Sequence, residues 1–137
     1  MFGLWNTSDA IQLAYPKENI PFVRTNKGIQ VDSTVYTLPE NEDELVTYSV
    51  YMGGDIGESV ITTNRPKLPN ILIYGDSFTN PLETLLWTQA NELRSIDFRY
   101  YTQCTLKDYI AEHKPDIVIC VRDETTFLSE AGNGITE

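Results

Sequence analysis

The chain has 137 residues, which is enough for one domain with a sizeable core, and 41% of them are hydrophobic. Twenty acidic residues against ten basic ones give a net charge of −10, which disfavours nucleic acid and anionic lipid as partners. No apolar run approaches the roughly 18 residues of a membrane helix, so no membrane insertion is expected. One histidine and two separated cysteines disfavour a metal centre, and no cofactor is expected.

Residues 1–65 have the composition of short strands and turns, and we predict a β-rich N-terminal segment. Four runs in this region are rich in strand-forming residues: 20–25, 30–38, 44–51 and 59–63. Turn-forming Gly, Pro, Asn and Asp separate these runs. The first nine residues contain neither a basic region nor an apolar stretch, so no signal peptide is expected in this chain.

Residues 66–137 differ from the first region because strands and helices alternate there. We expect five elements, in chain order: a strand over 70–74, a helix over 81–93, a strand over 95–101, a helix over 106–113 and a strand over 116–121. The apolar runs of the first and last of these strands predict burial on both faces. This β-α-β-α-β order is typical of a parallel sheet with helical crossovers. The predicted fold is therefore α/β, with a mostly parallel sheet that is incomplete in this chain.

The expected helix over 81–93 begins with a proline, a residue favoured in the first turn of a helix. Its leucines, Leu82, Leu85 and Leu86, recur at helical spacing and predict the face that packs on the sheet. The helix over 106–113 follows Thr105, which is a suitable N-cap residue.

Functional groups in an open parallel sheet collect beyond the carboxyl ends of the strands. Ser77 lies at this edge, between the first expected strand and the first expected helix. A tight turn there would expose its hydroxyl, and helix-initial N–H groups could stabilise an oxyanion. Gly75 would permit the turn, and Asp76 would bind backbone amides or orient a partner. Two interpretations of Ser77 stay open: a nucleophile, or an N-cap of the following helix.

Two arginines are also expected at this edge, each close to the end of a strand. Arg99 and Arg122 would either hold the carboxylates of a site or a sugar substrate, or form structural ion pairs with nearby acidic residues. The same edge carries Tyr100 and Tyr101, and either ring could stack on a sugar.

The run Ile-Leu-Ile-Tyr-Gly-Asp-Ser-Phe-Thr over 71–79 resembles the nucleophile block of the SGNH (GDSL-type) hydrolase superfamily. Together with 51–55, 97–101 and 121–124, it is similar to the subgroup named for an Asp-His-His-Trp motif, which is related to alginate O-acetyltransferases. The likeness extends over 48–133 and so covers the C-terminal part of this chain.

The resemblance implies a three-layer α/β/α domain in which Ser77 attacks an acyl ester. It also implies that the backbone N–H of Ser77 is an oxyanion donor, with Gly54 and Asn80 as candidates for a second one. The implied reaction is ester hydrolysis or transfer of an acetyl group to a carbohydrate hydroxyl. An acylated carbohydrate or polysaccharide would then be the partner, and the implied location is extracytoplasmic.

The sequence departs from this family because it contains no Asp-His-His-Trp motif. Its one histidine, His113, closes a predicted helix at the edge of the sheet opposite Ser77, which is too far for a general base. Loss of one member of such a catalytic set costs on the order of 10⁴–10⁶ in turnover.

Three explanations for the missing base are open. The chain is the nucleophile-bearing C-terminal part of a longer enzyme, a partner chain supplies the missing residues, or the chain is a non-catalytic polysaccharide-binding or assembly module. We favour the first explanation, in which this chain is one part of a longer enzyme and is inactive without the rest. An incomplete sheet also predicts pairing of two copies through an exposed edge.

Overall fold

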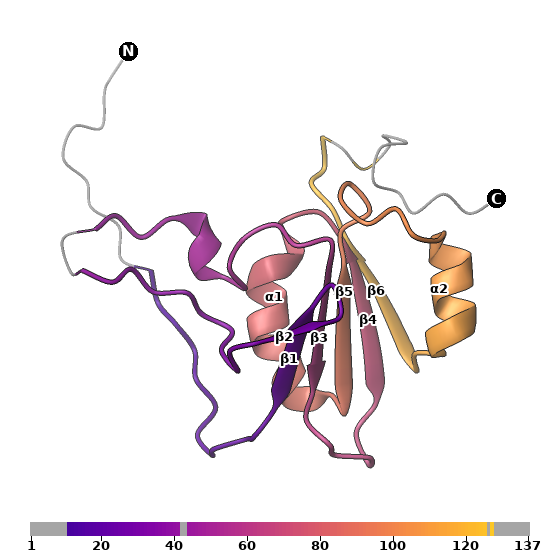
Figure 1. Ribbon diagram of the computed structural model, residues 1–137, viewed down its shortest axis with the longest axis horizontal. Helices are drawn as coiled ribbons and strands as arrows, with labels where there is room; N and C mark the ends of the chain where they lie inside the picture. Colours follow the sequence, from indigo (N-terminus) through magenta and orange to yellow (C-terminus); the bar gives the residue numbers. More distant parts are fainter. Residues whose placement is uncertain (1–10, 42–43, 126, 128–137) are drawn as a thin grey trace.

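The computed structural model describes residues 11–41, 44–125 and 127, and its strands form a single sheet (Figure 1). The strand order is β2-β1-β3-β5-β4-β6. The strands are β1 (Val23–Asn26), β2 (Ile29–Val31), β3 (Glu58–Thr62), β4 (Asn70–Gly75), β5 (Glu92–Ile96) and β6 (Ile117–Val121). The helices are α1 (Thr79–Leu86) and α2 (Leu106–His113), with 3₁₀ turns η1 (Tyr48–Val50) and η2 (Trp87–Gln89).

The sheet is mixed, so the prediction of a mostly parallel sheet is wrong. The central strand β4 runs parallel to both β5 and β6. The other three pairings, β5 with β3, β3 with β1 and β1 with β2, are antiparallel. A two-residue turn at Lys27 and Gly28 connects β1 to β2, and so short a turn permits only an antiparallel pair.

The expected alternation of strands and helices in the second half is confirmed as β4-α1-β5-α2-β6. Helix α2 has the predicted bounds, and the Thr105 side chain caps it by accepting a hydrogen bond from the N–H of Asp108. Strands from both halves of the chain belong to one sheet, since β3 pairs with β5. The boundary between 1–65 and 66–137 stays a prediction, and 128–137 lie outside the described residues.

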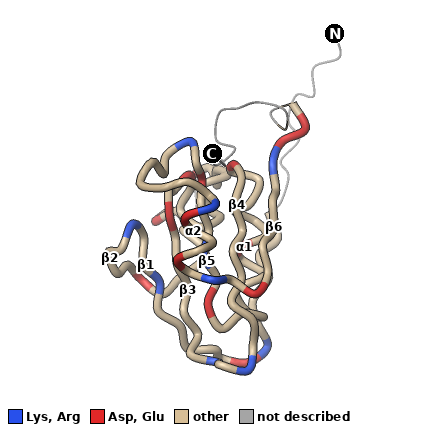
Figure 2. Tube along the Cα trace, turned by 90° about the vertical axis from the view of Figure 1, so that its right-hand side faces the viewer, with Lys and Arg blue, Asp and Glu red and all other residues tan. Residues whose placement is uncertain are grey.

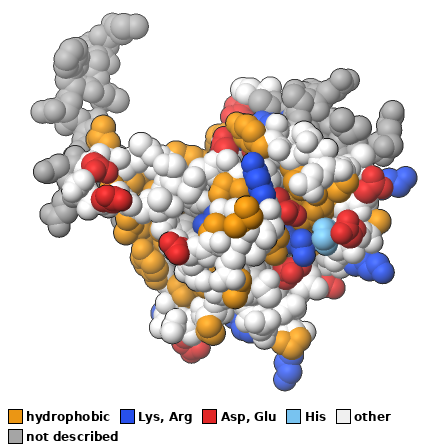
Figure 3. Space-filling model, in the orientation of Figure 1, with side chains coloured by type: hydrophobic (Ala, Val, Ile, Leu, Met, Phe, Trp, Pro, Cys, Tyr) orange, Lys and Arg blue, Asp and Glu red, His pale blue; other side chains and the backbone are white. Residues whose placement is uncertain are grey.

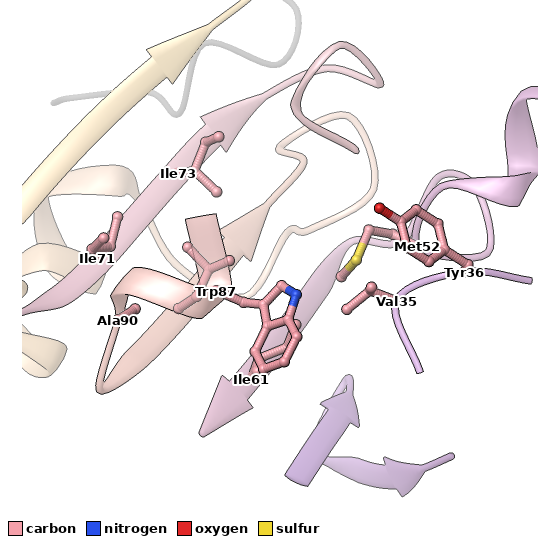
Figure 4. Packing of buried hydrophobic residues seen from close by; sticks show 9 residues of the cluster. Val35, Tyr36, Met52, Ile61, Ile71, Ile73, Trp87 and Ala90 are labelled. Carbon is pink, nitrogen blue, oxygen red and sulfur yellow. The ribbon is translucent and has the colours of Figure 1, made fainter. Parts of the chain in front are cut away.

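The apolar core lies on both faces of the sheet, because neighbouring residues of β4 point in opposite directions. Ile71 and Ile73 face α1 and η2 together with Trp87, as Figure 4 shows. Leu72 faces α2 and packs with Tyr109. The two helices thus lie on opposite sides of the sheet (Figure 1). Burial of each large apolar side chain contributes about 2 kcal/mol.

Helix α1 turns a polar side toward the sheet, and of the three leucines predicted to pack only Leu86 contacts the core. Its buried residues are Thr79, Asn80, Glu83 and Thr84. By contrast, Leu82 and Leu85 are 39% and 49% exposed. The reason lies in the surface beneath the helix, where strands β3 and β5 present serine hydroxyls rather than apolar groups. Trp87 and Ala90, just beyond α1, supply the apolar contact instead.

Strand β6 is less buried than its apolar sequence predicts. Ile117 and Val118 are each 43% exposed, whereas Leu72 and Ile73 of β4 are fully buried. Within the described part of the chain β6 has a single neighbouring strand, so only β4 covers it. Cys120 on this strand is consequently exposed and unpaired rather than part of the core.

Two further boundaries differ from the prediction. Strand β5 ends at Ile96, and the chain turns at once because the N–H groups of Tyr100 and Tyr101 donate to the Asp97 carbonyl. The run over 44–51 contains the 3₁₀ turn η1 rather than a strand. Both differences concern residues at the sheet edge that carries Ser77, where turns present side chains rather than extend the sheet.

Charged positions of both signs are spread along the turns and the ends of the elements in Figure 2. The space-filling view in Figure 3 shows hydrophobic side chains reaching the surface between the charged ones. Neither described helix is long and apolar enough to cross a membrane.

Candidate active site

The elbow that carries Ser77 joins the end of β4 to the start of α1. The N-cap position of α1 is Phe78 rather than Ser77, and no cap hydrogen bond comes from its side chain, so the Ser77 hydroxyl does not serve as the N-cap. The carbonyl of Ser77 accepts hydrogen bonds from the N–H of Asn80 at 3.1 Å and from the Tyr48 hydroxyl at 2.8 Å. Among the described residues, neither the hydroxyl nor the N–H of Ser77 has a hydrogen-bond partner. Both groups are therefore available to a ligand.

Gly75 allows β4 and β6 to approach each other just before this elbow. A Cβ at this position would lie 1.6 Å from the carbonyl oxygen of Val121, so only glycine fits. The adjacent N–H of Asp76 donates to the same carbonyl at 3.3 Å. The end of β6 thus sets the direction in which the chain leaves β4.

The buried carboxylate of Asp76 joins the elbow to the segment after β6. One of its oxygens accepts from the N–H of Phe78 at 3.0 Å, and the other accepts from the N–H of Asp123 at 2.8 Å. Two roles were expected for Asp76, to bind backbone amides or to orient a partner, and the structure shows the binding of backbone amides.

The two candidates for a second oxyanion donor lie in contact. Asn80 is buried, and its side-chain amide donates to the Gly54 carbonyl at 3.2 Å. The N–H of Gly54 already donates to the Tyr51 carbonyl at 3.1 Å. Because an amide group carries two N–H bonds, Asn80 retains one beyond its bond to Gly54. Asn80 is thus the better candidate of the two.

Arg99 is held by two carboxylates at the same edge. Its guanidinium lies 2.5 Å from Asp97 and 3.4 Å from Asp55. The hydrogen bonds to Asp97 raise the pKa of Arg99, partly opposed by burial. Asp97 lies two residues before Arg99 in the sequence, whereas the bond to Asp55 joins the loop before β3 to the turn after β5.

Arg122 lies apart from Arg99, on the other side of the elbow. It follows the last residue of β6, and its Cγ would lie 3.4 Å from a Cβ at Gly75. The edge therefore presents four segments in spatial order: the loop before β3, the turn after β5, the Ser77 elbow and the segment after β6.

Sequence reasoning missed a buried carboxyl group directly beneath the elbow. Glu83 of α1 is 2% exposed and accepts hydrogen bonds from Thr79 at 2.7 Å and Ser95 at 2.5 Å. Burial raises the pKa of Glu83; these hydrogen bonds and the charge of Arg24 partly oppose the shift. The signal that could have found this carboxyl group is the polar stripe of Thr79, Asn80 and Glu83 at helical spacing.

The buried guanidinium of Arg24 on β1 completes this polar cluster. It donates to the Ser59 hydroxyl at 3.2 Å, to the Thr34 carbonyl at 2.8 Å and to the Met52 carbonyl. A small cavity of about 10 Å³ lies among these groups, and Asn80 and Glu83 both line it. The cluster thus joins the first turn of α1 to three strands of the sheet.

The raised pKa of Glu83 predicts a specific pH dependence of stability. The folded protein holds the Glu83 proton more tightly than the unfolded chain, so this contribution is fully present below the unfolded pKa near 4.5. It is lost as the pH rises through the higher folded pKa. We expect the unfolding free energy of the wild type, relative to that of Glu83→Gln, to fall over this window. Urea unfolding of both proteins at a series of pH values measures this difference in unfolding free energy. A difference that stayed constant or rose with pH would contradict the raised pKa of Glu83.

Tyr48 is a second residue that the sequence did not single out. Its hydroxyl, which donates to the Ser77 carbonyl, has a raised pKa, chiefly because burial disfavours its ionised form. The ring stacks edge-on against Tyr51 with 5.6 Å between centroids. Tyr48 therefore joins the 3₁₀ turn η1 to the elbow.

His113 lies at the other edge of the sheet, as the predicted topology requires. It ends α2 and packs against the ring of Tyr109 with 4.2 Å between centroids. The start of β6 pairs with the start of β4, whereas Ser77 follows the end of β4. The length of β4 separates the two edges by roughly 16 Å. His113 cannot reach the Ser77 hydroxyl from there.

The described residues contain no group of three or more His, Cys, Asp or Glu side chains that could hold a metal ion. This edge offers the half-buried Ser77 with its hydroxyl and backbone N–H, and the buried amide of Asn80. A hydroxyl can act as a nucleophile and N–H groups can act as oxyanion donors.

Comparison with known proteins gives similarity in structure only. No family model and no curated protein matches the chain. Bacillus cereus PatB1 with a sulfonyl adduct matches with a TM-score of 0.66 at 20% identity, over 81% of this chain and 39% of that one. Another structure of PatB1 matches with a TM-score of 0.65 at 22% identity, over 79% of this chain and 37% of that one.

A DHHW family protein from Eubacterium siraeum matches with a TM-score of 0.63 at 18% identity, over 82% of this chain and 38% of that one. The chain thus spans well under half the length of these structures. Identities this low show a shared fold, and one match carries the name of the Asp-His-His-Trp subgroup. The chain has the fold of part of PatB1 and of a DHHW family protein.

Proposed function

We propose that this chain is the nucleophile-bearing C-terminal part of an SGNH-like serine esterase or carbohydrate O-acetyltransferase. The observation that carries the proposal is the elbow after β4, where the hydroxyl and the N–H of Ser77 are both free among the described residues. The fold shared with a DHHW family protein supports it. In the complete domain, helices on both faces of the sheet form the three-layer arrangement of such enzymes.

In this proposal Ser77 Oγ attacks the carbonyl carbon of an acyl ester. The new bond joins Oγ to that carbon, and the bond to the leaving oxygen breaks as the tetrahedral intermediate collapses. The N–H of Ser77 and the remaining N–H of the Asn80 amide donate to the oxyanion. Water or a carbohydrate hydroxyl then attacks the acyl carbon on the serine. Attack by water releases the acid, attack by the carbohydrate hydroxyl releases the new ester, and the bond to Ser77 Oγ breaks in both cases.

The reaction also needs a base that takes the proton from Ser77 Oγ. No described residue stands within hydrogen-bond reach of Oγ to do so. We propose that this base comes from polypeptide outside the chain, either from an upstream part of a longer enzyme or from a partner. This observation also favours a second candidate function, a non-catalytic module that binds polysaccharide.

The chain alone should therefore hydrolyse p-nitrophenyl acetate no faster than its Ser77→Ala variant. Absorbance of released p-nitrophenol measures both rates. A clear Ser77-dependent rate would show that a base exists within this chain and would contradict the proposed origin of the base.

A cysteine at position 77 tests the elbow without the missing base, since a thiol ionises near neutral pH and attacks unaided. Two variants with a single thiol each are compared: one carries Ser77→Cys and lacks Cys104 and Cys120, and the other keeps Cys104 and lacks Cys120. We expect p-nitrophenyl acetate to acetylate the first at least tenfold faster than the second. Intact-mass spectrometry counts the acetyl groups. Equal rates at the two positions would mean that the elbow does not stabilise an oxyanion.

A further inference from the structure

A second cavity opens at the same edge of the sheet, two strands away from the Ser77 elbow. Its volume is about 180 Å³. The turn between β1 and β2, the start of β3 and the loop after β5 surround it, through Lys27, Glu58, Tyr100, Tyr101, Thr102 and Gln103. None of these residues belongs to the elbow.

Two tyrosines give this cavity walls that are held in place. Tyr101 packs edge-on against Phe98 and Tyr109, with 6.0 and 5.7 Å between ring centroids. Tyr100 is 53% exposed, and the guanidinium carbon of Arg99 lies 5.3 Å from its ring centroid. Because Asp97 and Asp55 fix Arg99, the ring of Tyr100 is restrained as well.

The remaining lining side chains offer both donors and acceptors of hydrogen bonds to a ligand. Thr102 and Gln103 are exposed, and within the described residues their side chains form no hydrogen bond. Lys27 is also exposed and forms no ion pair with a described carboxylate. Glu58 accepts from the Tyr109 hydroxyl at 2.6 Å and adds an acceptor at the wall. The lining has one cationic residue, Lys27, and one anionic residue, Glu58, and Glu58 also lies 3.9 Å from the guanidinium of Arg94 outside the lining.

Aromatic walls with polar groups around them suit one class of ligand in particular. A hexopyranose ring has apolar C–H faces that stack on aromatic rings, and its hydroxyl groups both donate and accept. A lining without net charge suits a neutral sugar rather than an acidic or a basic one.

The register of the sheet sets the separation between this cavity and the nucleophile. Glu58 pairs with Ile96, and Ile96 pairs with Tyr74, which lies three residues before Ser77. Two strand spacings therefore separate Glu58 from Tyr74 by roughly 10 Å across the sheet, and the elbow continues three residues beyond Tyr74. An oligosaccharide of a few units spans that distance.

We propose that the Tyr100 cavity binds a neutral hexopyranose unit of a polysaccharide whose acylated unit, a few units along the same chain, reaches Ser77. This inference rests on the proposed function and adds a binding subsite to it. It assigns Arg99 a positioning role, because Arg99 holds the ring of Tyr100.

Titration of the ¹⁵N-labelled chain with chitotetraose and with cellotetraose tests the subsite. We expect amide shifts at Gly57 and at 100–103, and we expect Tyr100→Ala to weaken binding about tenfold through loss of the stacked ring. The matched control is Tyr15→Ala, since Tyr15 is an exposed ring outside the lining residues of this cavity, and its affinity should equal that of the wild type. Gln103→Ala provides a second exposed variant, with weaker binding expected.

Absence of shifts with both sugars at millimolar concentration would overturn the subsite, and so would shifts that Tyr100→Ala leaves unchanged. Sugar binding without acetylation of Ser77→Cys would remove the proposed nucleophile and keep the subsite. Acetylation of Ser77→Cys without sugar binding would remove the subsite and keep the proposed nucleophile.

Discussion

Replacement of Gly75 by alanine is expected to destabilise the protein by about 3 kcal/mol or more. The new methyl group would lie 1.6 Å from the carbonyl oxygen of Val121 and 2.7 Å from its carbonyl carbon. Both are backbone atoms of β6, so no side chain can rotate away to make room. The strands β4 and β6 would have to separate at the elbow, which would also displace the Asp76 N–H from Val121. Urea unfolding monitored by fluorescence measures the loss.

Gly28→Ala is the matched control for this substitution. No atom lies within 4 Å of a Cβ at Gly28, and its φ of +77° leaves only backbone strain. The cost of that strain is about 1 kcal/mol. If the two variants lost the same stability, the contact between Gly75 and Val121 would not be the cause.

Replacement of Glu83 by alanine is expected to cost about 3 kcal/mol and to loosen the elbow. The substitution leaves the hydroxyls of Thr79 and Ser95 without their acceptor inside the protein. It also removes the carboxyl group that lies near the buried guanidinium of Arg24. Unfolding in urea measures the stability. Hydrogen exchange at 77–80 measures the elbow, and we expect faster exchange there.

The control for this substitution is Glu112→Ala on α2. The Glu112 side chain is 71% exposed, and its stability effect should stay within about 0.5 kcal/mol. A Glu83→Ala variant as stable as this control would show that the polar cluster does not hold α1 on the sheet. Glu83→Gln, which keeps the shape of the side chain and an acceptor oxygen, should lose less than Glu83→Ala.

The order of elements after residue 70 could be predicted because local patterns determine it. Apolar runs of strand length, a proline at a helix start and a capping threonine act within a few residues of one another. For the same reason the elbow at Ser77 could be placed between β4 and α1. The exclusion of His113 followed from chain direction alone, since a helix that leads into a parallel strand ends at the opposite edge.

Pairing of the N-terminal strands could not be predicted in this way. Whether β3 joins β5, and in which direction, depends on partners far apart in the sequence. That pairing brings Gly54 and Asp55 to the edge that carries Ser77. It also creates the cavity beside Tyr100, which no single stretch of sequence contains.

The sequence by itself determined the alternation of strands and helices after residue 70, the glycine at the elbow and the position of a serine there, because these features depend on local backbone preferences. The tertiary structure decided which side of α1 is buried. Leucine spacing predicted an apolar contact, but the buried side carries Thr79, Asn80 and Glu83. Buried polar groups need partners, and the hydroxyl of Ser95 and the charge of Arg24 come from distant strands. Only the assembled sheet supplies them, so the orientation of the helix that follows Ser77 is a property of the whole fold.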